Sequence, residues 1–165
     1  MNPEKQKHTI SPIFSENSKI LILGSFPSVK SREVGFFYGH PQNRFWKVLS
    51  KLFESKLPIT VEEKKALLIN NRVALWDVVE SCTVEGSSDL SIKNVVPNDI
   101  ARILTLSEIT AVFTNGKTAS DLYRKYVMPS IELEDIRLPS TSPANAPFGF
   151  DKLCDNWKII LDFLK

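Results

Sequence analysis

Two stretches of the sequence gather side chains that could bind a planar, polar ring. The first is residues 24–46 (GSFPSVKSREVGFFYGHPQNRFW) and the second is residues 138–145 (LPSTSPAN). Each follows a strand-like run, and neither keeps the hydrophobic period of a helix or a strand. Long irregular loops in compact domains are uncommon and tend to be functional. We therefore expect the two stretches to converge on one site.

The polar side chains of these stretches, together with a TNG sequence at residues 114–116, are largely uncharged. Aromatic faces stack on planar rings, and an amide side chain presents a paired donor and acceptor. Such a pocket suits a nucleobase that has been turned out of its strand. Core packing of the consecutive aromatics is the alternative that the sequence leaves open. The residues concerned are Asn43, Asn115, His40, Ser140, Thr141, Ser142 and Asn145, beside Phe26, Phe36, Phe37 and Tyr38.

Other kinds of chemistry find little support. Of the two histidines, His8 lies in the N-terminal segment and His40 has no ligand partners at metal-binding spacing. Cys82 and Cys154 are too few for a disulfide framework or an iron–sulfur site. Neither a Walker loop nor a GxGxxG element is present, and Ser25 is not in a GxSxG elbow. The sequence predicts no metal and no cofactor.

Strand patterns alternate with helix patterns along the chain. Residues 19–23 form a continuous apolar run of the kind found in parallel strands buried on both faces. This alternation predicts an α/β fold with an open parallel sheet covered on both faces, in which ligands bind at the carboxyl ends of the strands. GSFP, TNG and PSTSP all fall at such ends. We expect strands at residues 19–23, 73–79, 109–113 and 132–138, helices at 43–53, 61–70, 98–106, 117–126 and 150–164, and an irregular loop at 81–92.

The bulk properties fit one intracellular domain. The chain has 165 residues, 42% of them hydrophobic and 24% charged, with a net charge of +2. No segment approaches the length of a membrane span, and the N-terminus lacks the apolar core of a signal peptide. The basic residues are scattered, so binding to a polyanion would need a local surface. We expect residues 1–18 to be a loosely attached polar lead-in and residues 19–165 to form a single, monomeric domain.

Taken together, GSFP, GFFYGHPQNRFW, FTNG and LPSTSPAN resemble the uracil-DNA glycosylase superfamily, and most closely its hypoxanthine-DNA glycosylase family, often called family 6. Each motif is weak alone, but four in the family's order are specific, and the resemblance covers residues 19–165. The resemblance implies a three-layer α/β/α sandwich around a four-stranded parallel sheet. It also implies a monofunctional enzyme of base excision repair that hydrolyses the N-glycosidic bond of deaminated bases in DNA, hypoxanthine first and uracil second.

The resemblance also implies roles for individual residues. The best-known uracil glycosylases place Asp or Asn in the first motif to activate water, whereas GSFP offers only Ser25. Family 6 takes this amide from its NxFW segment, which matches Asn43, although Asn is also a good helix N-cap. The family's second amide matches Asn115, as a reader of the base edge, although Asn-Gly is also a turn signal. The base pocket would comprise Gly24, Ser25, Phe26, Pro27, Phe37, Tyr38 and His40.

The LPSTSPAN loop resembles the segment that enters the minor groove. Pro143 and Ala144 would occupy the groove or the space vacated by the base, while Ser140, Thr141 and Ser142 hold phosphates and Asn145 completes the loop. His40 has either an electrostatic or a structural role. Two other functions remain open: a mismatch-specific uracil or thymine glycosylase, and a catalytically silent nucleic-acid-binding module of the same fold.

Overall fold

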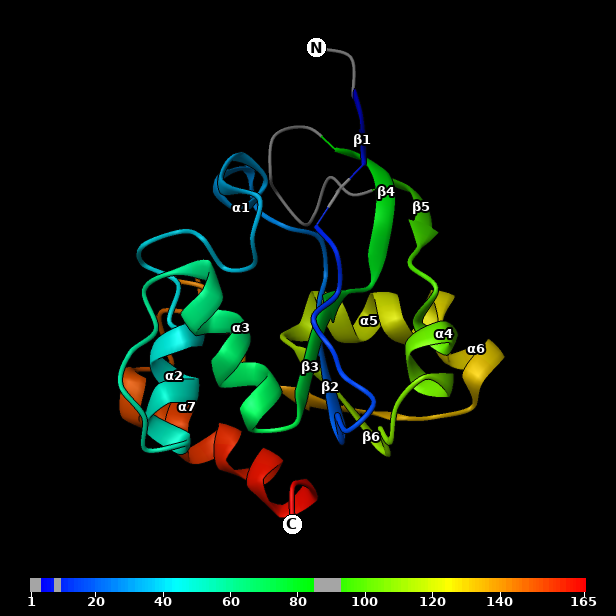
Figure 1. The fold of residues 1–165 in the computed structure, drawn as a ribbon. Helices are drawn as coiled ribbons and strands as arrows, with labels where there is room; N and C mark the ends of the chain where they lie inside the picture. The colour runs from blue at the N-terminus through cyan, green and yellow to red at the C-terminus, as the bar shows by residue number, and fades with distance from the viewer. Residues whose placement is uncertain (1–3, 8–9, 85–92) are drawn as a thin grey trace.

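The computed structural model describes residues 4–7, 10–84 and 93–165, and it contains two sheets (Figure 1). The larger sheet is entirely parallel, with strand order β3-β2-β6-β7. Its strands are β2 (Ile20–Gly24), β3 (Val73–Asp77), β6 (Ala111–Asn115) and β7 (Asp135–Leu138). The smaller sheet is antiparallel, with order β1-β4-β5, and consists of β1 (Glu4–Lys7), β4 (Val79–Val84) and β5 (Lys93–Pro97).

Helices cover both faces of the parallel sheet, which confirms the predicted three-layer α/β/α sandwich (Figure 1). Ile20 and Ile22 of β2 pack with α2, α3 and α7, whereas Leu21 and Leu23 pack with α4 and α5. Burial on both faces explains why this strand is apolar throughout. The helices are α1 (Val29–Val34), α2 (Phe45–Leu52), α3 (Val61–Asn70), α4 (Ile100–Thr105), α5 (Lys117–Tyr126), α6 (Met128–Ile131) and α7 (Phe150–Trp157), followed by the 3-10 helix η2 (Lys158–Phe163).

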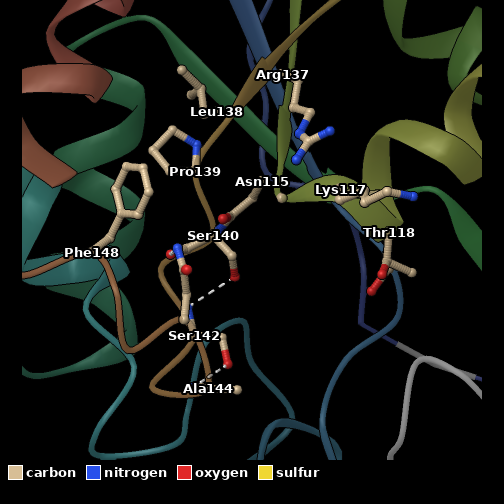
Figure 2. A pocket seen from close by; sticks show the side chains of 14 residues that line it. Asn115, Lys117, Thr118, Arg137, Leu138, Pro139, Ser140, Ser142, Ala144 and Phe148 are labelled. Atoms are coloured by element: carbon tan, nitrogen blue, oxygen red, sulfur yellow. Dashed lines mark hydrogen bonds between the residues drawn. The ribbon is translucent and has the colours of Figure 1, made fainter.

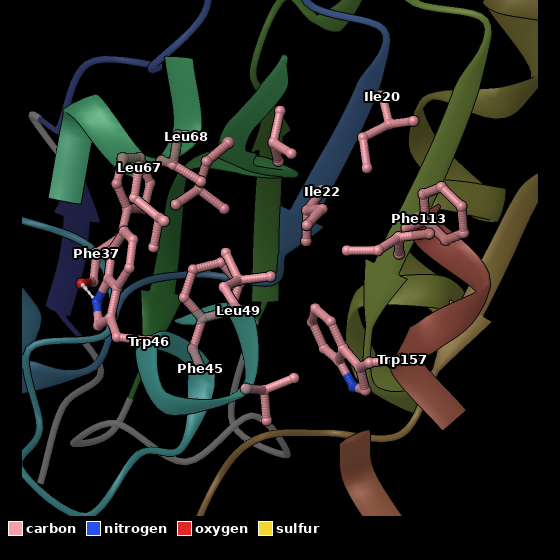
Figure 3. Packing of buried hydrophobic residues seen from close by; sticks show 14 of the residues in the cluster. Ile20, Ile22, Phe37, Phe45, Trp46, Leu49, Leu67, Leu68, Phe113 and Trp157 are labelled. Carbon is pink, nitrogen blue, oxygen red and sulfur yellow. Dashed lines mark hydrogen bonds between the residues drawn. The ribbon is translucent and has the colours of Figure 1, made fainter. Parts of the chain in front are cut away.

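Aromatic side chains fill the core beneath α2 and α7 (Figure 3). Phe45 packs edge-on against both Trp46 and Trp157, with ring centroids 4.8 and 5.9 Å apart. Phe36 stacks on Trp46, and Phe37 is 2% exposed. Phe36 therefore packs in the core, and so does most of the Phe37 side chain.

Three regions differ from the sequence-based expectation. The expected strand 73–79 ends at Asp77, and residues 81–84 of the expected loop belong to β4; β5 follows after residues that lie outside the described ranges, and the lead-in contributes β1. The lead-in is also not loosely attached, because Ile10 and Ile13 are buried and Ile13 bonds to Leu75 through both backbone groups. Short polar strands of an antiparallel ribbon carry little periodicity, so the pattern does not reveal them.

The expected irregular loop before Trp46 contains a short helix, α1. The Ser28 side chain caps this helix by accepting from the Ser31 backbone N–H, and the helix ends at Gly35, whose φ of 73° lies in the left-handed region that glycine tolerates. The buried Ser31 hydroxyl then accepts from the Gly39 N–H at 3.0 Å. These bonds fold the loop back over the end of β2.

Candidate active site

Three neighbouring strands end at the same level of the sheet. Gly24 of β2 pairs with Asp77 of β3, and the pairing of Leu23 with Thr114 places Asn115 of β6 beside Gly24 on its other flank. Because side chains alternate along a strand, Asp77 and Asn115 point to the same face of the sheet, the face covered by α2 and α7. The two side chains therefore flank the bare backbone of Gly24.

A cavity of about 270 Å³ opens over this strand edge. All seven residues of the predicted base pocket line it, together with Asn43, Asn115 and the loop from Ser140 to Pro143. The structure thus brings together residues from both stretches and from the end of β6. The lining residues are Gly24, Ser25, Phe26, Pro27, Ser28, Ser31, Phe37, Tyr38, His40, Asn43, Asp77, Asn115, Ser140, Thr141, Ser142 and Pro143.

Three side chains behind the cavity fix the two loops. The indole N–H of Trp46 donates to the Phe37 carbonyl at 3.1 Å, and that of Trp157 donates to the Pro139 carbonyl at 2.9 Å. The guanidinium of Arg44 donates to the carbonyls of Ser142, Asn145 and Phe148. Arg44 thus fastens the start of α2 to the LPSTSPAN loop. The role of Arg44 was not predicted, because an Arg beside Asn43 at a helix start has no distinctive sequence pattern.

The two amides of the site are joined through Thr141, whose side chain is fully buried. The Thr141 backbone N–H donates to Asn115 Oδ1 at 3.0 Å, and Asn115 Nδ2 donates to Thr141 Oγ1 at 3.0 Å. Thr141 Oγ1 in turn donates to Asn43 Oδ1 at 2.8 Å, and Asn43 Oδ1 also accepts from the Phe45 backbone N–H at 2.9 Å. Thr141 therefore faces inward, and its hydroxyl is not placed to hold a phosphate as the sequence suggested.

This chain of bonds fixes which way round each amide lies. A backbone N–H can only donate, so the atom facing Thr141 N must be the oxygen of Asn115, and the atom facing Phe45 N must be the oxygen of Asn43. Asn115 keeps one N–H and one lone pair for a ligand. Asn43 has both lone pairs of Oδ1 occupied and keeps only its N–H groups. Asn43 is thus a helix-start acceptor and a pocket donor at the same time.

A buried carboxylate and a buried phenol lie at the bottom of the cavity. Asp77 is 4% exposed, and a methyl group added at Gly24 would overlap its Oδ1 and lie 2.9 Å from the Tyr38 hydroxyl oxygen. Burial, and then the negative charge of Asp77, raise the pKa of Tyr38 well above its usual range, with the nearby Asn115 amide opposing them. Tyr38 is therefore a neutral O–H donor.

Asp77 was not among the predicted site residues, and it adds a carboxylate to a polar set that was expected to be largely uncharged. Its signal was available, because Asp77 ends the apolar run of the second strand at the same sheet edge as GSFP and TNG. Tyr38 also has a left-handed backbone with φ of 52°, and its ring stacks on Phe45 at 4.1 Å. Strained non-glycine residues of this kind persist where the surroundings hold them and often mark functional sites.

Phe26 and His40 border the cavity nearer to solvent. Phe26 is partly exposed, and the Arg32 guanidinium lies 5.3 Å from its ring centroid. His40 is exposed, and its Nδ1 accepts from the Gln42 N–H at 3.1 Å, so the proton of the neutral ring is on Nε2.

A larger hollow of about 570 Å³ adjoins this cavity and shares Ser25, Asn115, Ser140 and Ser142 with it; Figure 2 shows residues that line this hollow. The hydroxyl oxygens of Ser140 and Ser142 accept from the backbone N–H groups of Ser142 and Ala144, which leaves their protons free to donate. Pro143 and Ala144 are exposed at the tip. The basic side chains on the far wall of the hollow are Lys117 and Arg137.

None of the helices in the described part of the chain is long and apolar enough to cross a membrane. Residues 11–165 match the family model of the uracil DNA glycosylase superfamily. A hypoxanthine DNA glycosylase from Methanosarcina acetivorans is 33% identical over 145 residues, which cover 87% of this chain and 90% of the relative. A hypoxanthine DNA glycosylase from Methanosarcina barkeri is 31% identical, covering 85% and 89%.

A protein from Methanosarcina acetivorans solved by solution NMR superimposes on this fold with a TM-score of 0.81 and 30% identity, covering 96% of this chain and 98% of that one. The parallel sheet, the cavity at its carboxyl edge and the match over residues 11–165 agree with one another. The chain belongs to the uracil DNA glycosylase superfamily.

Proposed function

We propose that this protein is a DNA glycosylase that excises deaminated bases, hypoxanthine first and uracil second. The observation that carries the proposal is the pair of amides, Asn43 and Asn115, held in fixed orientation in one cavity at the sheet edge. The names of the two Methanosarcina relatives support it. The cavity of about 270 Å³ lies just below the usual range of about 300–1,000 Å³ for drug-sized ligands, which suits a single base.

The exposed loop tip provides a route for turning the base out of the duplex. Pro143 and Ala144 would enter the minor groove, and the free protons of the Ser140 and Ser142 hydroxyls would meet flanking phosphates. Lys117 and Arg137 in the adjacent hollow would add charge attraction for the strand. Pro143 and Ala144 form a small wedge, so base flipping would depend on weak pairing of the target base. This dependence favours mispaired, deaminated bases.

Bond cleavage would proceed with most of the charge separation before water attacks. The electrons of the C1′–N bond move to the base, and the sugar becomes cationic. Asn115 donates to the base through its remaining N–H, while Asn43 holds the oxygen of the attacking water through Nδ2. Water then bonds to C1′ and loses a proton, and the base leaves with one proton gained. The contribution of Asn43 is to position this water.

The described residues that line the cavity include no lysine, and we infer hydrolysis without a Schiff base and without strand cleavage. The decisive experiment is single-turnover excision from duplexes carrying hypoxanthine, uracil, a thymine mismatch or xanthine, followed by alkaline cleavage of abasic sites. Release of hypoxanthine that exceeds release of uracil supports the proposal. Release confined to uracil and mismatched thymine would favour a mismatch-specific enzyme, and binding without release of any base would favour a silent binding module.

A further inference from the structure

The bottom of the cavity carries three polar groups in a row. Along the sheet edge, Asp77 of β3 and Asn115 of β6 lie on either side of Gly24, on one face of the sheet. The Tyr38 hydroxyl lies over Gly24 itself. It therefore lies between the other two, and both influence its pKa. Adjacent strands are about 4.8 Å apart, so the backbones of Asp77 and Asn115 are about 10 Å apart across β2, and the row has room for a planar base between its outer groups.

Each group in the row has a fixed hydrogen-bonding character. Thr141 fixes the orientation of the Asn115 amide, so its second N–H is a donor on the side of the Tyr38 hydroxyl, where a base would compete for it. Tyr38 is a donor, and its buried hydroxyl oxygen has no hydrogen-bond partner among the described residues. The carboxylate of Asp77 can only accept when ionised. The row therefore has the order donor, donor, acceptor.

We propose that this row reads hypoxanthine along three consecutive positions: Asn115 donates to N7, Tyr38 donates to O6, and Asp77 accepts from N1–H. The inference rests on the proposed function and assigns its base recognition. Tyr38 and Asp77 thereby take the O=C–N–H edge, which the sequence alone suggested for Asn115. Uracil satisfies Tyr38 and Asp77 but has no atom in the position of N7, so hypoxanthine gains one bond more.

The same row explains the exclusion of adenine. Adenine presents an amino group to Tyr38 and a ring-nitrogen lone pair to Asp77, and a lone pair facing a buried carboxylate is repelled. Guanine shares O6 and N1–H with hypoxanthine, so its exclusion depends on its stable pairing and on its C2 amino group. Asp77 also opposes the negative charge that develops on the departing base, whereas Tyr38 and Asn115 stabilise that charge. Asp77 is thus a specificity-determining residue.

The test for Tyr38 compares two bases placed opposite an abasic-site analogue, where neither is paired. Unsubstituted purine lacks O6 and N1–H but keeps N7, so its release should be slow, because its N1 lone pair faces Asp77, and should not depend on a bond from Tyr38. Tyr38→Phe should slow hypoxanthine release by at least about tenfold, one hydrogen bond at the transition state, and change purine release by less than about threefold. Tyr126→Phe, the same change outside the cavity, should affect neither. Equal losses on both bases would overturn the assignment, because a packing defect does not distinguish them.

The test for Asp77 measures the ratio of hypoxanthine release to adenine release in the same context. Asp77→Asn allows the side chain to offer a donor to adenine, so the ratio should fall at least about tenfold, whereas Asp155→Asn, an exposed aspartate of α7, should leave it unchanged. An unchanged ratio in Asp77→Asn would overturn the role of Asp77. Wild-type protein that releases no base at all would refute the proposed function and the reading row together, an outcome distinct from both of these.

Discussion

The buried hydroxyl of Thr141 is the group whose removal tests the arrangement of the two amides most directly. Thr141→Val keeps the shape of the side chain and its backbone N–H but removes the donor to Asn43 and the acceptor for Asn115. Each amide retains one partner, so the cost is at the low end for a buried polar group, about 1 kcal/mol each. The total of about 2 kcal/mol corresponds to a fall in Tm of about 4–8 °C for a domain of this size.

The effect on excision should exceed the effect of instability. Without the hydroxyl, Asn43 and Asn115 each lose their hydrogen bond to Thr141 Oγ1. Single-turnover release of hypoxanthine, measured well below Tm, should therefore slow by at least about tenfold. Thr141→Ser restores the hydroxyl and should recover most of the rate. The assay is single-turnover excision from an inosine-containing duplex, paired with thermal unfolding of each variant.

Thr114→Val provides a matched control. Thr114 is also fully buried, and its hydroxyl donates to Asp135 Oδ2 at 2.6 Å on the opposite face of the sheet. The control should lose stability but not excision. If Thr141→Val excises at the wild-type rate, or if both variants lose excision equally, the hydroxyl of Thr141 does not orient the amides.

Four further perturbations follow from the same contacts. Asn43→Ala should slow excision at least about tenfold with little change in DNA binding. Asn43→Asp keeps both hydrogen bonds that the side chain accepts but removes its N–H donors. If Asn43→Asp excises at the wild-type rate, the donor role of Asn43 is wrong. Asn115→Asp cannot donate to the base when ionised and repels its developing charge, so its single-turnover rate should be at least as low as that of Asn115→Ala. Arg44→Lys cannot span three carbonyls, so amide hydrogen exchange of residues 140–148 should quicken and KM for DNA should rise; unchanged exchange would show that the loop holds itself. Burial raises the pKa of Asp135, but hydrogen bonds from Thr114, Arg124 and Ser120 hold this pKa below its ordinary value. The resulting stabilisation is complete above the unfolded pKa of about 3.9 and disappears as pH falls through the lower folded pKa. Asp135→Asn should therefore lower Tm at pH 7 and much less near pH 2, and an equal loss at both pH values would contradict the charge argument.

The sequence was sufficient to predict the parallel sheet, because a strand buried on both faces has a continuous apolar run that turns and loops lack. Residues 19–23 are apolar without a break, and the helix over residues 117–126 has the bounds of α5. The antiparallel ribbon was not predicted, because β4 and β5 are short and partly polar and the residues between them lie outside the described ranges. Hydrophobic periodicity reflects which side chains of a strand are buried, and the burial of β4 and β5 is too irregular to produce a clear period.

The candidate site divides in the same way. The amides and the pocket residues follow from their loops and from the family's motifs, and the structure brings them to one cavity. The inward orientation of Thr141 in a loop of small polar residues follows from no local pattern, because it depends on Asn43, which lies 98 residues away in the sequence. Asp77 was overlooked for a different reason: the expected strand 73–79 continued past it, whereas β3 ends at Asp77.

The groups that we propose to select the base lie on different elements from the group that we propose to position water. Asp77 ends the edge strand β3 and Asn115 ends the central strand β6; both strands pack in the core, and a reader of base edges needs that rigidity. Asn43 precedes a helix and is held by its neighbours rather than by a strand. Among the described residues, the hydroxyl of Thr141 bonds to both amides, and so links the two groups to which we assign base reading and water positioning. Substitutions at Asp77 should therefore change which base is released, those at Asn43 how fast, and those at Thr141 both together.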